Sequence, residues 1–163
     1  MNNKPKSAVI AALLAALVCV ATMIIRIPSP LHGYINLGDG VVLLCGWLLS
    51  PMYGFLAAGI GSALADILSG YTLYAPITLL LKGGMALIAC GIARALHKKP
   101  LISKIFGGTL AEIVMIGGYL AFESVLYGFV PSLANVPANA IQGLAGLLVG
   151  LILIRIFEKT KLF

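Results

Sequence analysis

Several residues that could do chemistry in this chain are charged side chains inside strongly apolar segments. Asp39, Asp66 and Lys82 all lie within one apolar stretch, residues 33–84. On insertion scales each charge costs about 2.5–3.5 kcal/mol at the centre of a bilayer, so charges in such positions call for a functional or structural reason. We expect Asp66 and Lys82 to form a structural ion pair that fixes the register of two helices. Direct contact of Lys82 or Asp66 with a ligand is the alternative.

More polar side chains follow in the second half of the chain. Tyr119 and Glu123 are four residues apart and therefore share a face of a predicted helix. Asn139 and Gln142 open the last apolar segment, and each amide offers a donor and an acceptor, which suits a neutral heterocycle. A solvated carboxylate is the alternative for Glu123, and a hydrogen bond between helices is the alternative for the two amides.

The candidate substrate-binding residues are predicted to lie at one depth in the membrane. Two of them, a tyrosine and an asparagine, belong to the first long loop. For Asn36 and Asp39 a role as helix caps is the alternative. The full set is Tyr34, Asn36, Asp39, Lys82, Tyr119, Glu123, Asn139 and Gln142.

Enzyme chemistry has little support in the sequence. No serine, histidine and aspartate pattern is present, and no phosphate loop of the form G-x-x-x-x-G-K-[ST], so we expect ATP hydrolysis to belong to separate partners. Cys19, Cys45 and Cys90 stand alone in apolar runs, which indicates neither disulfides nor a metal site. We expect no cofactor and no metal. The net charge of +6 comes in short clusters without an aromatic-rich basic face, which argues against nucleic acid as a partner.

The composition predicts an all-α integral membrane protein. The chain is 61% apolar and only 10% charged, whereas soluble domains average about 45–50% and about 25%. We predict a single domain, residues 1–163, built as a bundle of six transmembrane helices. The second and third segments are short, and a re-entrant pair is their alternative. The predicted segments are 8–25, 37–49, 52–68, 74–96, 104–129 and 138–157.

Two stretches between the apolar segments are predicted to be loops. Residues 26–36 contain Pro28 and Pro30, which exclude a regular helix, together with apolar residues poorly suited to water. We expect this first long extracellular loop to fold over the protein as a lid. Residues 131–137 are predicted to be a second loop.

The distribution of basic residues predicts the orientation. With six crossings, nine lysines and arginines fall on the side of the termini and Arg26 alone on the other. Because basic residues collect in cytoplasmic loops, both termini are predicted to be cytoplasmic. The nine are Lys4, Lys6, Arg94, Lys98, Lys99, Lys104, Arg155, Lys159 and Lys161.

Three motifs carry a family resemblance. GYINLGDG at 33–40, SPMYGFLAAGIGSALAD at 50–66 and YAPIT at 74–78, followed by Lys82-Gly83, resemble the substrate-binding S components of energy-coupling factor (ECF) vitamin transporters. The resemblance is to the branch that includes the riboflavin, hydroxymethylpyrimidine and pyridoxine types. The carboxy-terminal half matches in layout only.

The resemblance implies a receptor that captures a small vitamin at the outer side of the bacterial plasma membrane. It also implies docking on a transmembrane coupling subunit that carries two cytoplasmic ATPases. The first helix has a small-residue face at four-residue spacing, Ala8, Ala12 and Ala16, which is either an internal packing face or the docking face that the resemblance implies.

We expect a pyridoxine-like or hydroxymethylpyrimidine-like substrate, with riboflavin or a queuosine precursor as alternatives. A stand-alone proton-coupled transporter, using Glu112, Glu123 and Lys82 as a relay, is an alternative of another class, and a purely structural membrane protein is a third.

Overall fold

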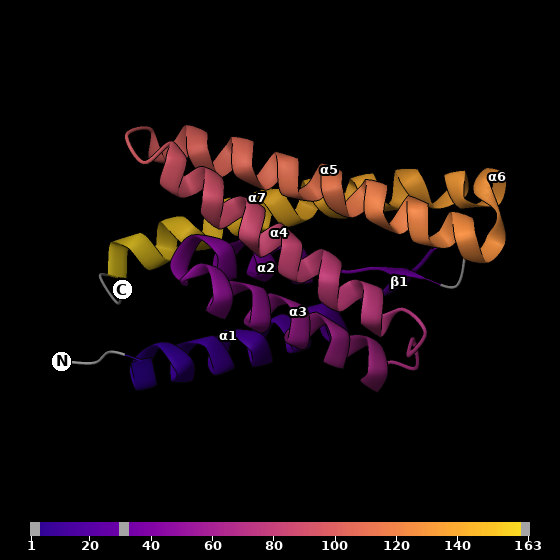
Figure 1. Ribbon diagram of the computed structural model, residues 1–163, viewed down its shortest axis with the longest axis horizontal. Coiled ribbons are helices and arrows are strands. Elements are labelled where there is room, and N and C mark those ends of the chain that lie inside the picture. The colour runs from indigo at the N-terminus through magenta and orange to yellow at the C-terminus, as the bar shows by residue number, and fades with distance from the viewer. Residues whose placement is uncertain (1–3, 30–32, 161–163) are drawn as a thin grey trace.

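The computed structural model describes residues 4–29 and 33–160, which form a bundle of helices with one small β-hairpin (Figure 1). The helices are α1 (Lys4–Ile24), α2 (Gly38–Leu48), α3 (Pro51–Leu68), α4 (Ala75–Ala95), α5 (Pro100–Tyr127), α6 (Phe129–Ser132), the 3₁₀ turn η1 (Leu133–Asn135) and α7 (Val136–Thr160). Strands β1 (Ile27–Pro28) and β2 (Tyr34–Ile35) pair antiparallel, with Ile27 opposite Ile35.

Within residues 4–29 and 33–160, five helical stretches are long and apolar enough to cross a membrane. They correspond to α1, α3, α4, α5 and the run from α6 through α7. The all-α membrane fold predicted from the apolar segments is therefore confirmed. Helix α2 has 11 residues and a length of about 16 Å, about half of a ~30 Å hydrocarbon core. The 37–49 segment is thus helical as predicted, but its helix alone is too short to span.

The two ends of the bundle differ in what they carry. Both termini, the end of α4 and the start of α5 lie at one end, which we call the terminal end (Figure 1). The β-hairpin, α6 and the turn between α3 and α4 lie at the other, which we call the hairpin end (Figure 1). Lys161 and the middle of the first loop, residues 30–32, fall outside the described residues.

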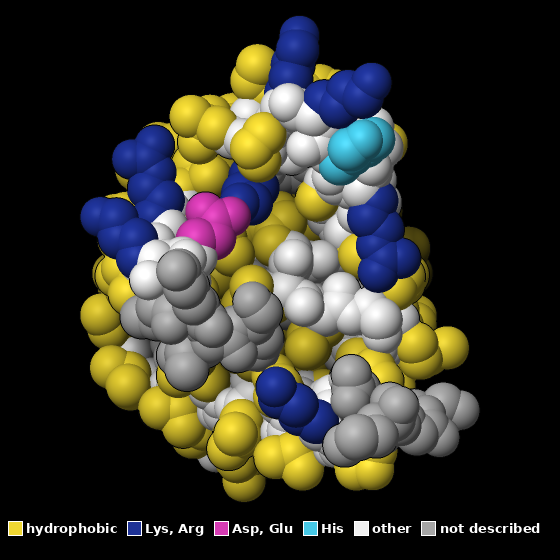
Figure 2. All heavy atoms as spheres, turned by 90° about the vertical axis from the view of Figure 1, so that its left-hand side faces the viewer, with side chains coloured by type: hydrophobic (Ala, Val, Ile, Leu, Met, Phe, Trp, Pro, Cys, Tyr) yellow, Lys and Arg dark blue, Asp and Glu magenta, His cyan; other side chains and the backbone are white. Residues whose placement is uncertain are grey.

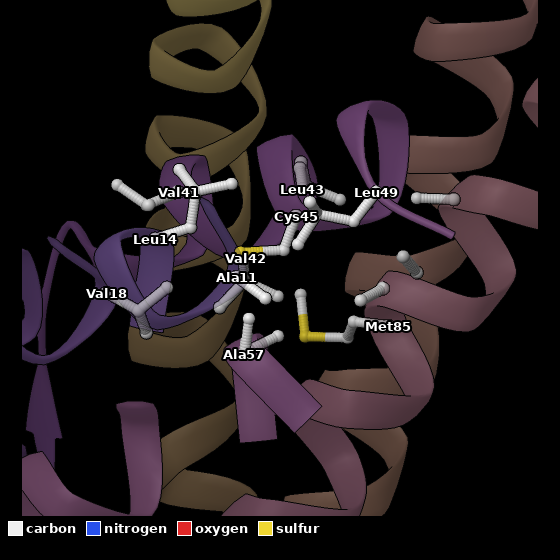
Figure 3. Packing of buried hydrophobic residues seen from close by; sticks show 14 of the residues in the cluster. Ala11, Leu14, Val18, Val41, Val42, Leu43, Cys45, Leu49, Ala57 and Met85 are labelled. Carbon is white, nitrogen blue, oxygen red and sulfur yellow. The ribbon is translucent and has the colours of Figure 1, made fainter. Parts of the chain in front are cut away.

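Small residues let the helices approach closely. A Cβ added at Gly61 of α3 would lie 2.4 Å from the carbonyl oxygen of Ala15 in α1, and one at Gly46 of α2 would lie 2.5 Å from that of Ala86 in α4. Such backbone contacts are how helices associate where water supplies no hydrophobic drive. The closely packed interior contains Val42, Leu43 and Met85, which are fully buried (Figure 3).

The region predicted as a second loop is helical instead. Residues 131–137 fall in α6, in η1 and in the first turn of α7. Proline is tolerated in a first helical turn because the N–H that it lacks has no helical partner there. Pro131 and Pro137 lie in the first turns of α6 and α7, in a stretch that was predicted to be a loop.

Candidate functional site

A cavity opens at the hairpin end, between the β-hairpin and the ends of α1, α3, α4, α5 and α7. The space between its walls, including the part open to solvent, is about 500 Å³. All the predicted substrate-binding residues except Asp39 line it. The lining residues are Thr22, Ser29, Gly33, Tyr34, Asn36, Ser62, Asp66, Tyr71, Tyr74, Thr78, Lys82, Tyr119, Glu123, Asn139 and Gln142.

Lys82 is held by a buried ion pair at the inner wall of the cavity. Its ammonium group contacts Asp39 Oδ1, and the side chains are 3% and 1% exposed. The sequence led us to expect a pair between Lys82 and Asp66, and the structure corrects the partner. Helix α2 packs against α4 as α3 does, and Asp39 in its first turn meets Lys82, whereas Asp66 is engaged by Tyr34.

Gln142 connects this ion pair to the first loop. Its Nε2 donates to Asp39 Oδ2 at 2.7 Å, and its Oε1 accepts from the backbone N–H of Asn36 at 3.0 Å and from Asn36 Nδ2 at 3.3 Å. Asn36 Oδ1 in turn accepts from the N–H of Gly38 at 2.9 Å, an Asx-type contact at the start of α2. Asp39 therefore lies behind the cavity wall and fixes the residues that form it.

Tyr34 ties the hairpin to α3. Its hydroxyl donates to Asp66 Oδ1 at 2.6 Å, and its ring lies 4.6 Å from that of Tyr71. Burial, followed by the charge of the Asp66 carboxylate, raises the pKa of the Tyr34 phenol above its ordinary value. The phenol thus stays protonated and remains a hydrogen-bond donor.

Glu123 lies at the opposite wall. It is only 2% exposed, which rules out the solvated carboxylate considered above. Its Oε1 accepts from Asn135 Nδ2 at 2.8 Å and from the Tyr74 hydroxyl at 3.3 Å. Burial is the first of the causes that raise the pKa of Tyr74, and the charge of Glu123 adds to it.

Tyr119 completes the aromatic side of the cavity. Its hydroxyl is 2.9 Å from Thr78 Oγ1, and the Lys82 ammonium lies 5.6 Å from the centre of its ring. The ring of Tyr74 is 6.4 Å away. Together these contacts give the cavity a flat apolar wall beside its polar groups, the usual combination for holding a ring with polar substituents.

Four polar atoms of cavity-lining side chains have no hydrogen-bond partner within residues 4–29 and 33–160. They are Thr22 Oγ1, Ser62 Oγ, Asp66 Oδ2 and Glu123 Oε2. Buried polar atoms are normally paired, and each one left alone costs about 1–3 kcal/mol.

Two further groups singled out in the sequence lie away from the cavity wall. Both carboxylate oxygens of Glu112 are buried without a partner in the described part of the chain, and they lie close to Gly143 and Gly146 of α7. Ala8, Ala12 and Ala16 are exposed, while α1 packs inward through Ala11, Leu14 and Val18. The alanine face is therefore exposed in the described part of the chain.

Sequence reasoning missed several lining residues for which a signal existed. Thr78 stands four residues before Lys82, and Ser62 four before Asp66, so each shares a helix face with a residue already chosen. Tyr71 and Tyr74 border the start of α4, where tyrosine is equally typical of the membrane interface. Asn135 is not a lining residue but donates to Glu123, and it gave no signal because its segment was expected to be a loop.

Comparisons with known proteins agree with one another. Residues 2–159 match the family model of the ECF-type riboflavin transporter, S component. An uncharacterized protein of Pyrococcus woesei is 37% identical over 134 residues, which cover 82% of this chain and 88% of that one. The thiamine precursor transporter HmpT of Lactococcus lactis subsp. cremoris is 24% identical over 163 residues, covering 98% and 93%.

A solved structure shares the fold. The S component of a bacterial ECF transporter superposes with a TM-score of 0.75 at 21% identity and covers 98% of this chain and 99% of its own. Members of the matched family are transporter components and multi-pass membrane proteins, which accords with the five spanning-length helices. The chain therefore belongs to the S-component family of ECF-type riboflavin transporters.

Proposed function

We propose that this S component captures a small vitamin or vitamin precursor in the cavity at its hairpin end and delivers it to an ECF module. The observation that carries the proposal is the cavity itself. It combines tyrosine rings, a fixed ammonium group and four unpaired polar atoms beneath a β-hairpin. A structural membrane protein has no need of unpaired polar atoms around a hollow.

The first loop would act as the lid of the cavity. Two contacts tie it down, one from Tyr34 to Asp66 and the other from Asn36 to Gln142. Each joins the loop to a residue of the cavity wall, so opening the loop would expose the site. In this proposal a substrate enters when these contacts open and excludes water when they form again.

The proposed substrate is a hydroxymethylpyrimidine-like or pyridoxine-like heterocycle. The similarity to a thiamine precursor transporter supports the pyrimidine, and riboflavin is the alternative suggested by the family name. The wall supplies donor and acceptor groups from Asn139 and Thr78, which suits a ring with hydroxyl and nitrogen substituents. A queuosine precursor remains the further alternative.

Ligand-induced thermal stabilisation tests this directly. The purified protein is heated in detergent with each compound of a vitamin panel, and a ligand at 100 times its Kd stabilises the folded state by about 2.7 kcal/mol. We expect a rise in Tm for at least one small heterocycle. Failure of every compound to bind at nanomolar to micromolar concentration would contradict the receptor function.

Six crossings with cytoplasmic termini form part of the same proposal. A cysteine replacing Leu73, which is exposed at the hairpin end, would react in intact cells with a membrane-impermeant maleimide. A cysteine replacing Lys98 at the terminal end would react only after lysis. The native Cys19, Cys45 and Cys90 are first changed to alanine. The reverse labelling pattern would overturn the orientation.

The exposed alanine face of α1 is the proposed docking site for the transmembrane coupling subunit, which carries two cytoplasmic ATPases. Replacing Ala8, Ala12 and Ala16 together by leucine adds bulk only on an exposed face. We expect normal ligand binding but loss of co-purification with the coupling subunit. Leu13→Ala, on another exposed part of α1, is the control.

A stand-alone proton-coupled transporter predicts a different result. Liposomes that contain this chain alone would take up substrate when a proton gradient is applied, and Glu112→Gln would abolish that uptake. Our proposal predicts no uptake without the ECF module and ATP.

A further inference from the structure

We propose that the cavity selects a cationic ligand rich in hydrogen-bond donors over neutral and anionic relatives of the same ring. The inference rests on the proposed function, because it concerns which substrate the same cavity takes. It follows from the charges of the wall and from which of them are already neutralised.

The one ammonium group in the described cavity wall is already committed. Lys82 contacts Asp39, a carboxylate behind the wall, and both side chains are almost fully buried. A buried ammonium paired in this way has little charge left to offer an anionic ligand. Arg26 is exposed and is not among the lining residues.

The two carboxylates of the wall are in the opposite situation. Asp66 and Glu123 are 5% and 2% exposed, and neither forms an ion pair within the described residues. Each uses one oxygen to accept hydrogen bonds from neutral groups, and each keeps a second oxygen unpartnered, Asp66 Oδ2 and Glu123 Oε2. Two buried carboxylate oxygens of wall residues thus lack donors within the described residues.

A cationic N–H group is the partner that these oxygens lack. Hydrogen bonds between an ionised donor and a carboxylate are roughly twice as strong as neutral ones, and pairing removes the cost of burying an isolated charge. Tyr34, Tyr71, Tyr74 and Tyr119 add ring faces, which attract cations. Both kinds of group favour a protonated amine or an aminated, protonatable ring.

The same arrangement opposes an anion. A phosphate ester or carboxylate in the cavity would meet Asp66 and Glu123, with no uncommitted cation in the described wall to offset the repulsion. Like charges brought together in this way are a common device for rejecting a wrong ligand. The chain as a whole carries +6, so this preference is a property of the cavity and is opposite to that of the molecule.

The test uses probes that differ in one group. Pyridoxamine and pyridoxine share a ring and differ in an aminomethyl against a hydroxymethyl group, and pyridoxamine 5′-phosphate adds an anion. The second pair is 4-amino-5-hydroxymethyl-2-methylpyrimidine and its 4-hydroxy analogue.

Binding to the purified full-length chain is measured by titration at neutral pH for the wild type, Asp66→Asn, Glu123→Gln and Glu158→Gln. Glu158 is a carboxylate at the terminal end, away from the cavity, and serves as the matched control.

In the wild type and in Glu158→Gln we expect the amino member of a pair to bind at least about tenfold more tightly than its hydroxy partner, with the phosphate weakest. In Asp66→Asn or Glu123→Gln the ratio should fall several-fold. Circular dichroism and size-exclusion chromatography identify any variant that fails to fold, and the wild-type ratios then decide. Equal or tighter binding of the hydroxy or phosphate compounds by the wild type would overturn the charge inference while leaving the receptor function intact. Binding of no compound in the whole vitamin panel would contradict the proposed function itself.

Discussion

The two ends of the bundle each contain an ion pair, and the pairs differ in nearly every respect. At the hairpin end Lys82 and Asp39 are buried, with side chains 3% and 1% exposed. At the terminal end Lys104 contacts Glu158, which is 54% exposed. Figure 2 looks at the terminal end and shows lysine and arginine side chains around its surface. The hairpin end carries the acidic, tyrosine-lined cavity.

The contrast shows that one small chain keeps solvated charges at its terminal end and buried charges at its hairpin end. Exposed basic residues suit the membrane surface and cost little folding free energy, because water solvates them. Buried charges are expensive unless they are paired, and they are concentrated around the cavity. We therefore expect substitutions to have large effects at the hairpin end and small effects at the terminal end.

The largest expected effect comes from breaking the buried pair. Lys82→Met leaves Asp39 buried without a cation and should lower the free energy of unfolding by about 3–5 kcal/mol. Unfolding is followed by thermal denaturation in detergent. The double variant Asp39→Asn/Lys82→Met should recover much of the loss, because no unpaired charge remains. A single variant as stable as the wild type would contradict the role assigned to the pair.

A smaller effect is expected from Gln142→Ala. It leaves Asp39 Oδ2 and the Asn36 N–H without their partner, which should cost about 2–3 kcal/mol. Ligand affinity should fall as well, because the loop loses its attachment to α7. Ile141→Ala, at the neighbouring exposed position, is the control. Equal stabilities of the two variants would show that the amide does not organise the site.

Tyr34→Phe tests the attachment of the hairpin alone. It removes the 2.6 Å hydrogen bond to Asp66 but keeps the ring beside Tyr71, so stability should fall by only about 1.5 kcal/mol. The loop should open more easily, and the bound ligand should dissociate about tenfold faster in stopped-flow measurements. An unchanged dissociation rate would argue against the loop as a lid.

The smallest effect is expected at the terminal end. Glu158→Gln breaks the exposed pair with Lys104 and should change stability by less than about 1 kcal/mol. The same thermal denaturation measures it. A loss as large as that of Lys82→Met would remove the contrast between the two ends.

The sequence was sufficient for the helices and for much of the cavity wall. Long apolar runs can form little else in a membrane, and a charged residue such as Lys82 within such a run identifies a site because burying it is costly. Helix starts near proline were harder to predict, since residues 131–137 were predicted to be a loop, whereas Pro131 lies in the first turn of α6.

The partner of Lys82 could not be derived from sequence. Asp39 and Asp66 lie at the same predicted depth, and depth alone does not say which of them faces Lys82. That choice depends on how α2 and α3 pack against α4, which is set by close contacts at glycines such as Gly46 and Gly59. Asn135, which binds Glu123, was missed for a related reason, because its segment was not expected to be helical.

We propose that the cavity at the hairpin end holds the substrate. The most direct measurement is titration calorimetry with the compound that gives the largest thermal stabilisation, applied to the wild type, Asn139→Trp and Glu158→Gln. Asn139 lines the cavity and is half-buried, so a tryptophan there would occupy the space of a ring. We predict one site of equal affinity in the wild type and in Glu158→Gln, and binding at least about 100-fold weaker in Asn139→Trp. Unchanged affinity in a folded Asn139→Trp would place the substrate elsewhere and contradict the account.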